Sequence, residues 1–195
     1  MLNVKKFFLL VSLFMISGCS VKEAAPLKVY TLDAGYIAPV SHSKHRGQTI
    51  KVSYPQTLKD TLTNGMAYSY SSSERGVYQN SKWSNNAGKL IQGNIIQILT
   101  HSRIFKAVLP YESTAGEDLR LESIVFDFSH HVRGEASFAI VSIQMNLINT
   151  DSGKLIKTKR FSYKEDTQTL DAKGYAEATN RAMSRFSRDL IVWLR

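Results

Sequence analysis

The second half of the chain contains three long runs in which apolar and polar residues alternate. A strand points successive side chains to opposite faces, so this pattern predicts strands with one covered and one wetter face. Gly134 and Gly153 lie in short polar segments between the runs, which suit tight turns and predict an antiparallel meander. The alternation slips between Leu121 and Phe126, which allows a β-bulge. The three runs are residues 119–131, 137–149 and 155–164.

Two other segments carry apolar residues at helical spacing and predict amphipathic helices. Ser84 is a suitable N-cap for the first segment and Asp171 for the second. Gly88 and Gly93 lie inside the first and each lower helix stability by up to about 1 kcal/mol relative to Ala. They favour close packing on a sheet or local fraying. The helical segments are residues 85–102 and 171–195.

The first half of the chain predicts shorter elements. Residues 34–48 gather Gly, Pro, Ser, His and basic residues without periodicity, which is typical of a poorly ordered loop. Residues 56–63 could form a turn or two of helix, and the polar segment 71–75 predicts a hairpin turn. Short strands are expected at residues 27–32, 49–54, 66–70, 76–79 and 106–109.

The length of the chain and these elements together predict the fold class. A chain of 195 residues suits one domain, and its 43% hydrophobic content excludes a disordered protein. About seven strands and two helices predict an α+β single domain, an antiparallel-rich mixed sheet with two amphipathic helices packed on one face.

The N-terminus has the layout of an export signal. Lys5 and Lys6 precede a ten-residue apolar run that is too short to favour a permanent transmembrane helix. Residues 16–19 resemble a bacterial lipobox, which implies cleavage after Gly18 and acylation of Cys19. An ordinary signal peptide with a chance cysteine is the alternative. We expect a signal peptide at 1–18, a lipidated N-terminus and tether at 19–26, and one domain at 27–195.

Charge and motif content limit the chemistry. Removal of residues 1–18 lowers the formal charge from +9 to +7, so the mature chain is still basic. That charge suits either a soluble surface or contact with anionic headgroups or an acidic partner. Lys154, Lys157, Lys159 and Arg160 make the last predicted strand basic, which either protects a sheet edge or contacts headgroups or an acidic partner.

The sequence contains no GxSxG, HExxH or GxGxxG motif, so it indicates no catalytic residue and no cofactor beyond the covalent lipid. His130 and His131 adjoin on a predicted strand and point to opposite faces, which disfavours a shared metal ion. We expect no metal site, and export removes nucleic acid as a partner.

An aromatic cluster is the strongest candidate for a binding surface. Tyr68, Tyr70 and Tyr78 flank the predicted hairpin turn, and Trp83 follows them. These residues either pack across the strands or form an exposed patch for a partner or an acyl chain. We expect them as possible partner-contact residues.

The chain resembles the ABC-type transport auxiliary lipoprotein family, in particular its PqiC-like group, over nearly all of the mature domain. Residues 34–48 and 71–75 match poorly. The resemblance rests on the following residues: Cys19, 30–33, Ile50, Lys51, Val52, Pro55, Leu58, 66–70, Tyr78, Trp83, 90–99, Leu119, Leu121, Ile124, Phe126, Ala178, Ala182, Leu190, Trp193 and Leu194.

This resemblance implies a non-enzymatic lipoprotein of the outer membrane that faces the periplasm. Its implied partners are an ABC permease with its ATPase and an MCE-domain protein, which together move lipids between two membranes. Ser20 after Cys19, in place of Asp, favours the outer membrane by the same resemblance. A phospholipid is a further possible ligand. The alternatives are a structural envelope lipoprotein without a transport role, and an exported hydrolase using His130 and a carboxylate such as Asp127.

Overall fold

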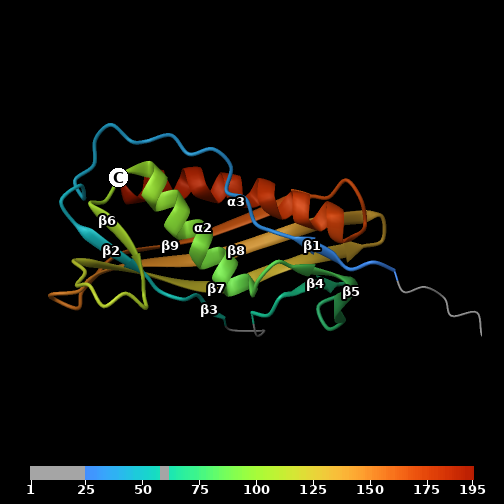
Figure 1. The fold of residues 1–195 in the computed structure, drawn as a ribbon. Helices are drawn as coiled ribbons and strands as arrows, with labels where there is room; N and C mark the ends of the chain where they lie inside the picture. The colour runs from blue at the N-terminus through green and yellow to red at the C-terminus, as the bar shows by residue number, and fades with distance from the viewer. Residues whose placement is uncertain (1–24, 58–61) are drawn as a thin grey trace, which may run out of the picture.

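The computed structural model describes residues 25–57 and 62–195, which form one mixed nine-stranded sheet with two helices on one of its faces (Figure 1). This is the α+β single domain that the sequence predicts. The helices are α2 (Ala87–Ser102) and α3 (Ala172–Leu194). The strands are β1 (Lys28–Tyr30), β2 (Thr49–Val52), β3 (Gln56–Thr57), β4 (Gly65–Ser69), β5 (Arg75–Trp83), β6 (Ala107–Pro110), β7 (Leu119–Arg133), β8 (Ala136–Asn149) and β9 (Leu155–Asp166).

The long strands β7, β8 and β9 form the predicted antiparallel meander. The register between β7 and β8 shifts between Val125 and Asp127, so Phe126 is the extra residue of a β-bulge. The bulge lies at the end of the stretch in which the alternation slips, and it confirms that prediction. β9 pairs only with β8 among the described strands, so it is an edge strand.

The opposite edge of β7 is shared by three short strands that run parallel to it. β2 pairs near its start, β3 near its middle and β4 near its end. Beyond β4 the sheet continues through β5 to β1, and beyond β2 it continues to β6. The strand Gln56–Thr57 replaces the first part of the helix expected at 56–63. Residues 58–61 of that prediction lie outside the described residues.

Both helices cover the same face of the sheet. α3 packs on β8 and β9, and α2 packs on β2 and β6. The Asp171 side chain accepts a hydrogen bond from the amide of Gly174, which confirms the predicted N-cap of α3. The N-cap of α2 is Asn86, two residues after the predicted Ser84, and its side chain accepts from the amide of Gly88.

Large aromatic residues fill the layer between the helices and the sheet. Trp83 and Tyr175 meet edge to face with ring centroids 5.5 Å apart, and Phe161 and Phe186 meet in the same way at 5.4 Å. Trp83, Tyr175 and Phe186 are fully buried. Burial of each such side chain contributes about 1.5–3 kcal/mol or more, so this layer holds the helices on the sheet.

Residues 34–48, in the segment between β1 and β2, were expected to be poorly ordered, and that expectation is wrong for most of them. The segment runs over the outer side of both helices (Figure 1), so the helices lie between it and the sheet. Ile37 and Val40 are buried, the Ser187 hydroxyl donates to the Ala34 carbonyl at 3.3 Å, and the Val40 amide donates to the Ser102 carbonyl at 2.8 Å. Gly35 and Pro39 interrupt its apolar residues, so no helix or strand pattern extends through the segment and the periodicity did not reveal these contacts.

The basic side chains of β9 are engaged with neighbouring rings and carbonyls. The Arg160 guanidinium lies 3.9 Å from the ring centre of Phe126, and the Lys157 ammonium lies 5.2 Å from that of Trp193. The Lys157 ammonium also donates to the Trp193 carbonyl. These contacts hold the cations against the sheet and the end of α3, on an edge that would otherwise be open for pairing.

Candidate functional site

The predicted tyrosine cluster lies on and beside β4 and β5, which with β1 form one end of the sheet (Figure 1), and Ala25 and Pro26 line the same hollow as these rings. The ring centroids of Tyr68 and Tyr70 are 5.1 Å apart, as are those of Tyr68 and Tyr78. Cross-strand packing is therefore confirmed. Tyr68 and Tyr78 are partly buried, whereas Tyr70 is 51% exposed. Whether they contact a partner remains a prediction.

An open groove runs along this cluster, with a volume of about 680 Å³. We call it the tyrosine groove, and its lining includes Ala25, Lys28, Tyr70, Val77 and Asp171. Hydrogen bonds from Thr169 and from the first amides of α3 lower the pKa of Asp171, which stays ionised close to Lys28. The groove therefore combines aromatic and aliphatic walls with both signs of charge, at the point where the described chain begins.

Trp83 does not belong to this surface. Its side chain is 1% exposed and packs against Phe128 and Tyr175 inside the domain. A partner cannot reach it, so its inclusion among the contact residues is wrong. The burial of Trp83 comes from residues far away in the sequence, because this last residue of β5 meets Phe128 of β7 and Tyr175 of α3.

Behind the tyrosines, His130 joins a buried chain of polar groups. Its Nδ1 lies 2.7 Å from the Tyr78 hydroxyl and its Nε2 lies 2.5 Å from the Ser137 hydroxyl, which also accepts from Thr167 at 2.6 Å. The ring stacks on Tyr175 at 5.3 Å and is 0% exposed. Burial lowers the pKa of His130 to about 4 and raises the pKa of Tyr78 to about 12. The network is therefore neutral, and it ties β5 to β7 and β8.

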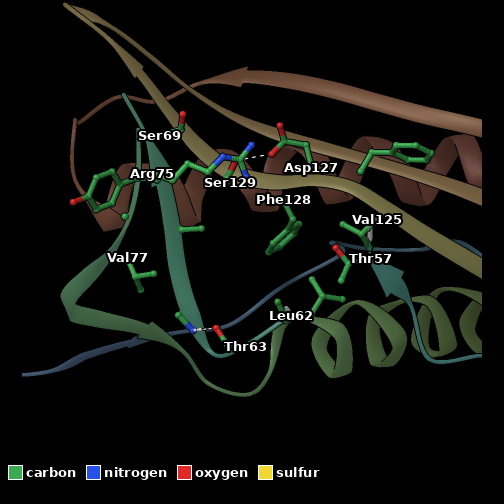
Figure 2. Close-up of a pocket in the computed structure, with 16 residues that line it drawn as sticks. Thr57, Leu62, Thr63, Ser69, Arg75, Val77, Val125, Asp127, Phe128 and Ser129 are labelled. Carbon is green, nitrogen blue, oxygen red and sulfur yellow. Dashed lines mark hydrogen bonds between the residues drawn. The ribbon is translucent and has the colours of Figure 1, made fainter. Parts of the chain in front are cut away.

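A second hollow lies where the sheet is incomplete, between the points at which β3 and β4 pair with β7 (Figure 2). We call it the sheet-gap pocket, and its volume is about 260 Å³. Leu62, Val77, Val125 and Phe128 provide apolar walls, and Asp127 lies among the polar groups of its lining. The bulge at Phe126 falls in this gap, and Phe126 itself lines the pocket.

Polar residues at every second position of β7 form a cluster beside this pocket. The Ser129 hydroxyl donates to Asp127 Oδ1 at 2.5 Å, and His131 Nε2 lies 3.1 Å from Asp127 Oδ2. Arg133 donates to His131 Nδ1 at 3.2 Å. Burial raises the pKa of Asp127, but the hydrogen bonds from His131 and Ser129 and the charge of Arg75 outweigh it and lower that pKa. Figure 2 shows Arg75 extended toward Asp127.

This cluster contains serine, histidine and aspartate but lacks the geometry of a nucleophilic relay. In a relay, one imidazole nitrogen faces the serine and the other faces the carboxylate. Here His131 Nε2 faces both Ser129 and Asp127, at 3.1 Å each. Because Nδ1 accepts from Arg133, Nε2 carries the proton and cannot take one from Ser129. The alternative pairing of His130 with Asp127 is wrong, because their side chains lie on opposite faces of β7 and His130 contacts Tyr78 and Ser137 instead.

Two features are absent from the part of the chain that the structure describes. Within residues 25–57 and 62–195, no helix is both long and apolar enough to cross a bilayer. In the same ranges no three His, Cys, Asp or Glu residues lie close enough together to hold a metal ion. Cys19, the expected lipidation site, and the expected signal peptide at 1–18 lie outside the described residues.

Comparison with known protein families assigns the chain to one of them. Residues 30–191 match the sequence model of the ABC-type transport auxiliary lipoprotein component. The chain therefore belongs to this family, as the resemblance predicts, and membership makes it a lipoprotein associated with an ABC-type transport system. No curated protein sequence matches the chain significantly.

Solved structures show the same fold at low sequence identity. Protein XCC0632 from Xanthomonas campestris is 15% identical with a TM-score of 0.74, and the match covers 86% of this chain and 93% of that one. An uncharacterized protein is 16% identical with a TM-score of 0.61, covering 87% and 99%. The hypothetical protein CT253 from Chlamydia trachomatis is 6% identical with a TM-score of 0.53, covering 76% and 95%. At these identities the likeness concerns the fold alone.

Proposed function

We propose that this protein is an outer-membrane lipoprotein that faces the periplasm and serves as the docking subunit of an MCE-type lipid transporter driven by an ABC ATPase. The observation that carries the proposal is the match of residues 30–191 to a transport auxiliary lipoprotein family, and residues 16–19, which precede it and end at Cys19, resemble a lipobox. The family match supports the association with a transporter, and the lipobox-like segment supports the lipid anchor.

Anchoring at Cys19 keeps the domain at one membrane without a spanning helix. Each buried acyl CH₂ contributes about 0.8 kcal/mol, and a single chain binds only marginally, so the three chains of a mature lipoprotein make a stable anchor. Loss of Cys19 therefore removes membrane attachment while the domain stays folded, because the described core lies entirely after residue 25.

The form of the two hollows favours docking over lipid carriage. The sheet-gap pocket has about 260 Å³, which is below the roughly 300–1,000 Å³ typical of pockets that enclose a small ligand. The tyrosine groove has about 680 Å³, but it is an open surface hollow that does not enclose a ligand. The ATPase of the transporter supplies the energy in this proposal, and the lipoprotein supplies an anchored contact surface.

Photo-crosslinking in cells tests the proposal. A photoreactive amino acid is placed at Tyr70 in the tyrosine cluster, at Tyr36 on the segment over the helices, and at Val192 near the C-terminus, all of which are exposed. We expect at least one position to capture an MCE-domain protein, and Cys19→Ala to abolish that adduct because the domain leaves the membrane. Adducts with unrelated envelope proteins alone would contradict a transport role and favour a structural envelope lipoprotein.

A further inference from the structure

Exposed apolar side chains collect at one end of the domain. Leu27, Val29, Tyr70, Val77 and Leu170 are each more than half exposed. The first four lie on or beside β1, β4 and β5, which are neighbours in the sheet. Leu170 is attached to the same end, since its carbonyl accepts from the Tyr78 hydroxyl at 3.4 Å. We call these five residues the tether-end surface.

The position of this surface along the chain limits what it can meet. The described chain begins at Ala25, which lines the tyrosine groove, and Leu27 follows two residues later. Six residue steps separate Cys19 from Ala25, so the tether spans at most about 22 Å even when fully extended, at about 3.6 Å per residue. The C-terminus, which follows α3, lies at the opposite end of the domain from β1 (Figure 1), and Val192 belongs to the last turn of α3.

The chemistry of the surface matches the interfacial layer of a bilayer. That layer is about 5–7 Å thick on each side of the hydrocarbon core. Tyrosine rings and aliphatic side chains are favoured there, and lysine places its ammonium among the headgroups. Tyr70 and Val77 line the groove together with exposed Lys28. Asp171 is the carboxylate among the lining residues, and it accepts hydrogen bonds from the first amides of α3.

We infer that the tether-end surface rests in the headgroup layer of the membrane that holds the lipid anchor, and so fixes the orientation of the domain. This inference rests on the proposed function, because it needs the anchor at Cys19. In this orientation β1, β4 and β5 face the bilayer, and the end that carries Val192 faces the periplasm and is available to a partner.

The experiment uses the lipidated mature protein, residues 19–195, in vesicles of phosphatidylethanolamine and phosphatidylglycerol. Cys19 is the one cysteine of the chain and its sulfur is blocked by lipid, so an introduced cysteine is the single free thiol. An environment-sensitive fluorophore is attached to Val29→Cys and Val77→Cys, with Val192→Cys as the matched control at 71% exposure. Thermal melting of each variant shows that the fold is retained.

We expect a blue shift of emission at positions 29 and 77, with quenching by lipids that carry a quencher near the headgroup. Position 192 is expected to respond only to a water-soluble quencher. Vesicle flotation separates the two claims. Failure of the unlabelled protein to float would overturn the anchor and hence the proposed function. Flotation with identical responses at 29, 77 and 192, or capture of an MCE-domain protein from Tyr70, would overturn the orientation alone.

Discussion

Acidification provides a quantitative test of the buried network around His130. The ring is 0% exposed and both nitrogens are engaged by Tyr78 and Ser137. Burial and, to a smaller extent, the charge of His131 lower its pKa from 6.5 to about 4, against an opposing effect of Asp171. The unfolded chain therefore takes up a proton below pH 6.5, whereas the folded chain resists it until about pH 4. The stability due to neutral His130 is complete above pH 6.5 and is lost as the pH falls.

The size of this effect follows from proton linkage. A pKa difference between 6.5 and about 4 corresponds to about 3.4 kcal/mol when the titration is complete. About 2.5 kcal/mol of it is lost between pH 7.5 and 4.5. His130→Gln keeps a donor and an acceptor at this position but does not titrate. We expect its free energy of unfolding to fall less over this interval than that of the wild type, by about 2.5 kcal/mol.

The assay is urea unfolding at several pH values, followed by tryptophan fluorescence, with His42→Gln as a control at an exposed histidine. Asp127, Glu117 and Asp171 also have lowered pKa values and lose stability in acid, but they do so equally in the wild type and the variant. Parallel curves for the wild type and His130→Gln would show that His130 is not held neutral by burial.

Other substitutions test the packing of the helices. Gly93→Ala meets no atom within 4 Å and should stabilise the domain by up to about 1 kcal/mol in thermal unfolding, since Gly costs that much in a helix interior. Gly174→Ala would place its Cβ 2.3 Å from the Thr169 carbonyl oxygen, so we expect a lower melting temperature, and an unchanged one would contradict the packing. Phe186→Ala should lower the free energy of unfolding in urea by about 3–5 kcal/mol. Val192→Ala, at an exposed position of the same helix, should change it by no more than about 0.5 kcal/mol. Equal losses would contradict the assignment of the buried face.

The elements that could be predicted are those with a long, regular pattern. The runs at β7, β8 and β9 and the helix after Asp171 differ from their predicted bounds by only a few residues. The parallel pairing of β2, β3 and β4 with β7 could not be predicted, because two- to five-residue strands carry no signal of their neighbours. Local pattern also could not show that Ile37 and Val40 would be buried against the helices.

The candidate site was predicted only in part, for a similar reason. The spacing of Tyr68, Tyr70 and Tyr78 in a hairpin indicated a cluster, and the structure brings them together. It could not indicate that Trp83 would be buried, because that depends on contacts with Phe128 and Tyr175, which lie 45 or more residues further along the chain. Nor could it indicate that His130 would bond to Tyr78, since 52 residues separate them along the chain.

Mass spectrometry of the N-terminal peptide from the mature protein, isolated from membranes of its native cells, tests the central claim most directly. We predict a peptide that begins at Cys19 and carries a thioether-linked diacylglycerol and an amide-linked acyl chain. A peptide that begins upstream of Cys19, or one whose cysteine is unmodified, would contradict the account of an anchored docking subunit.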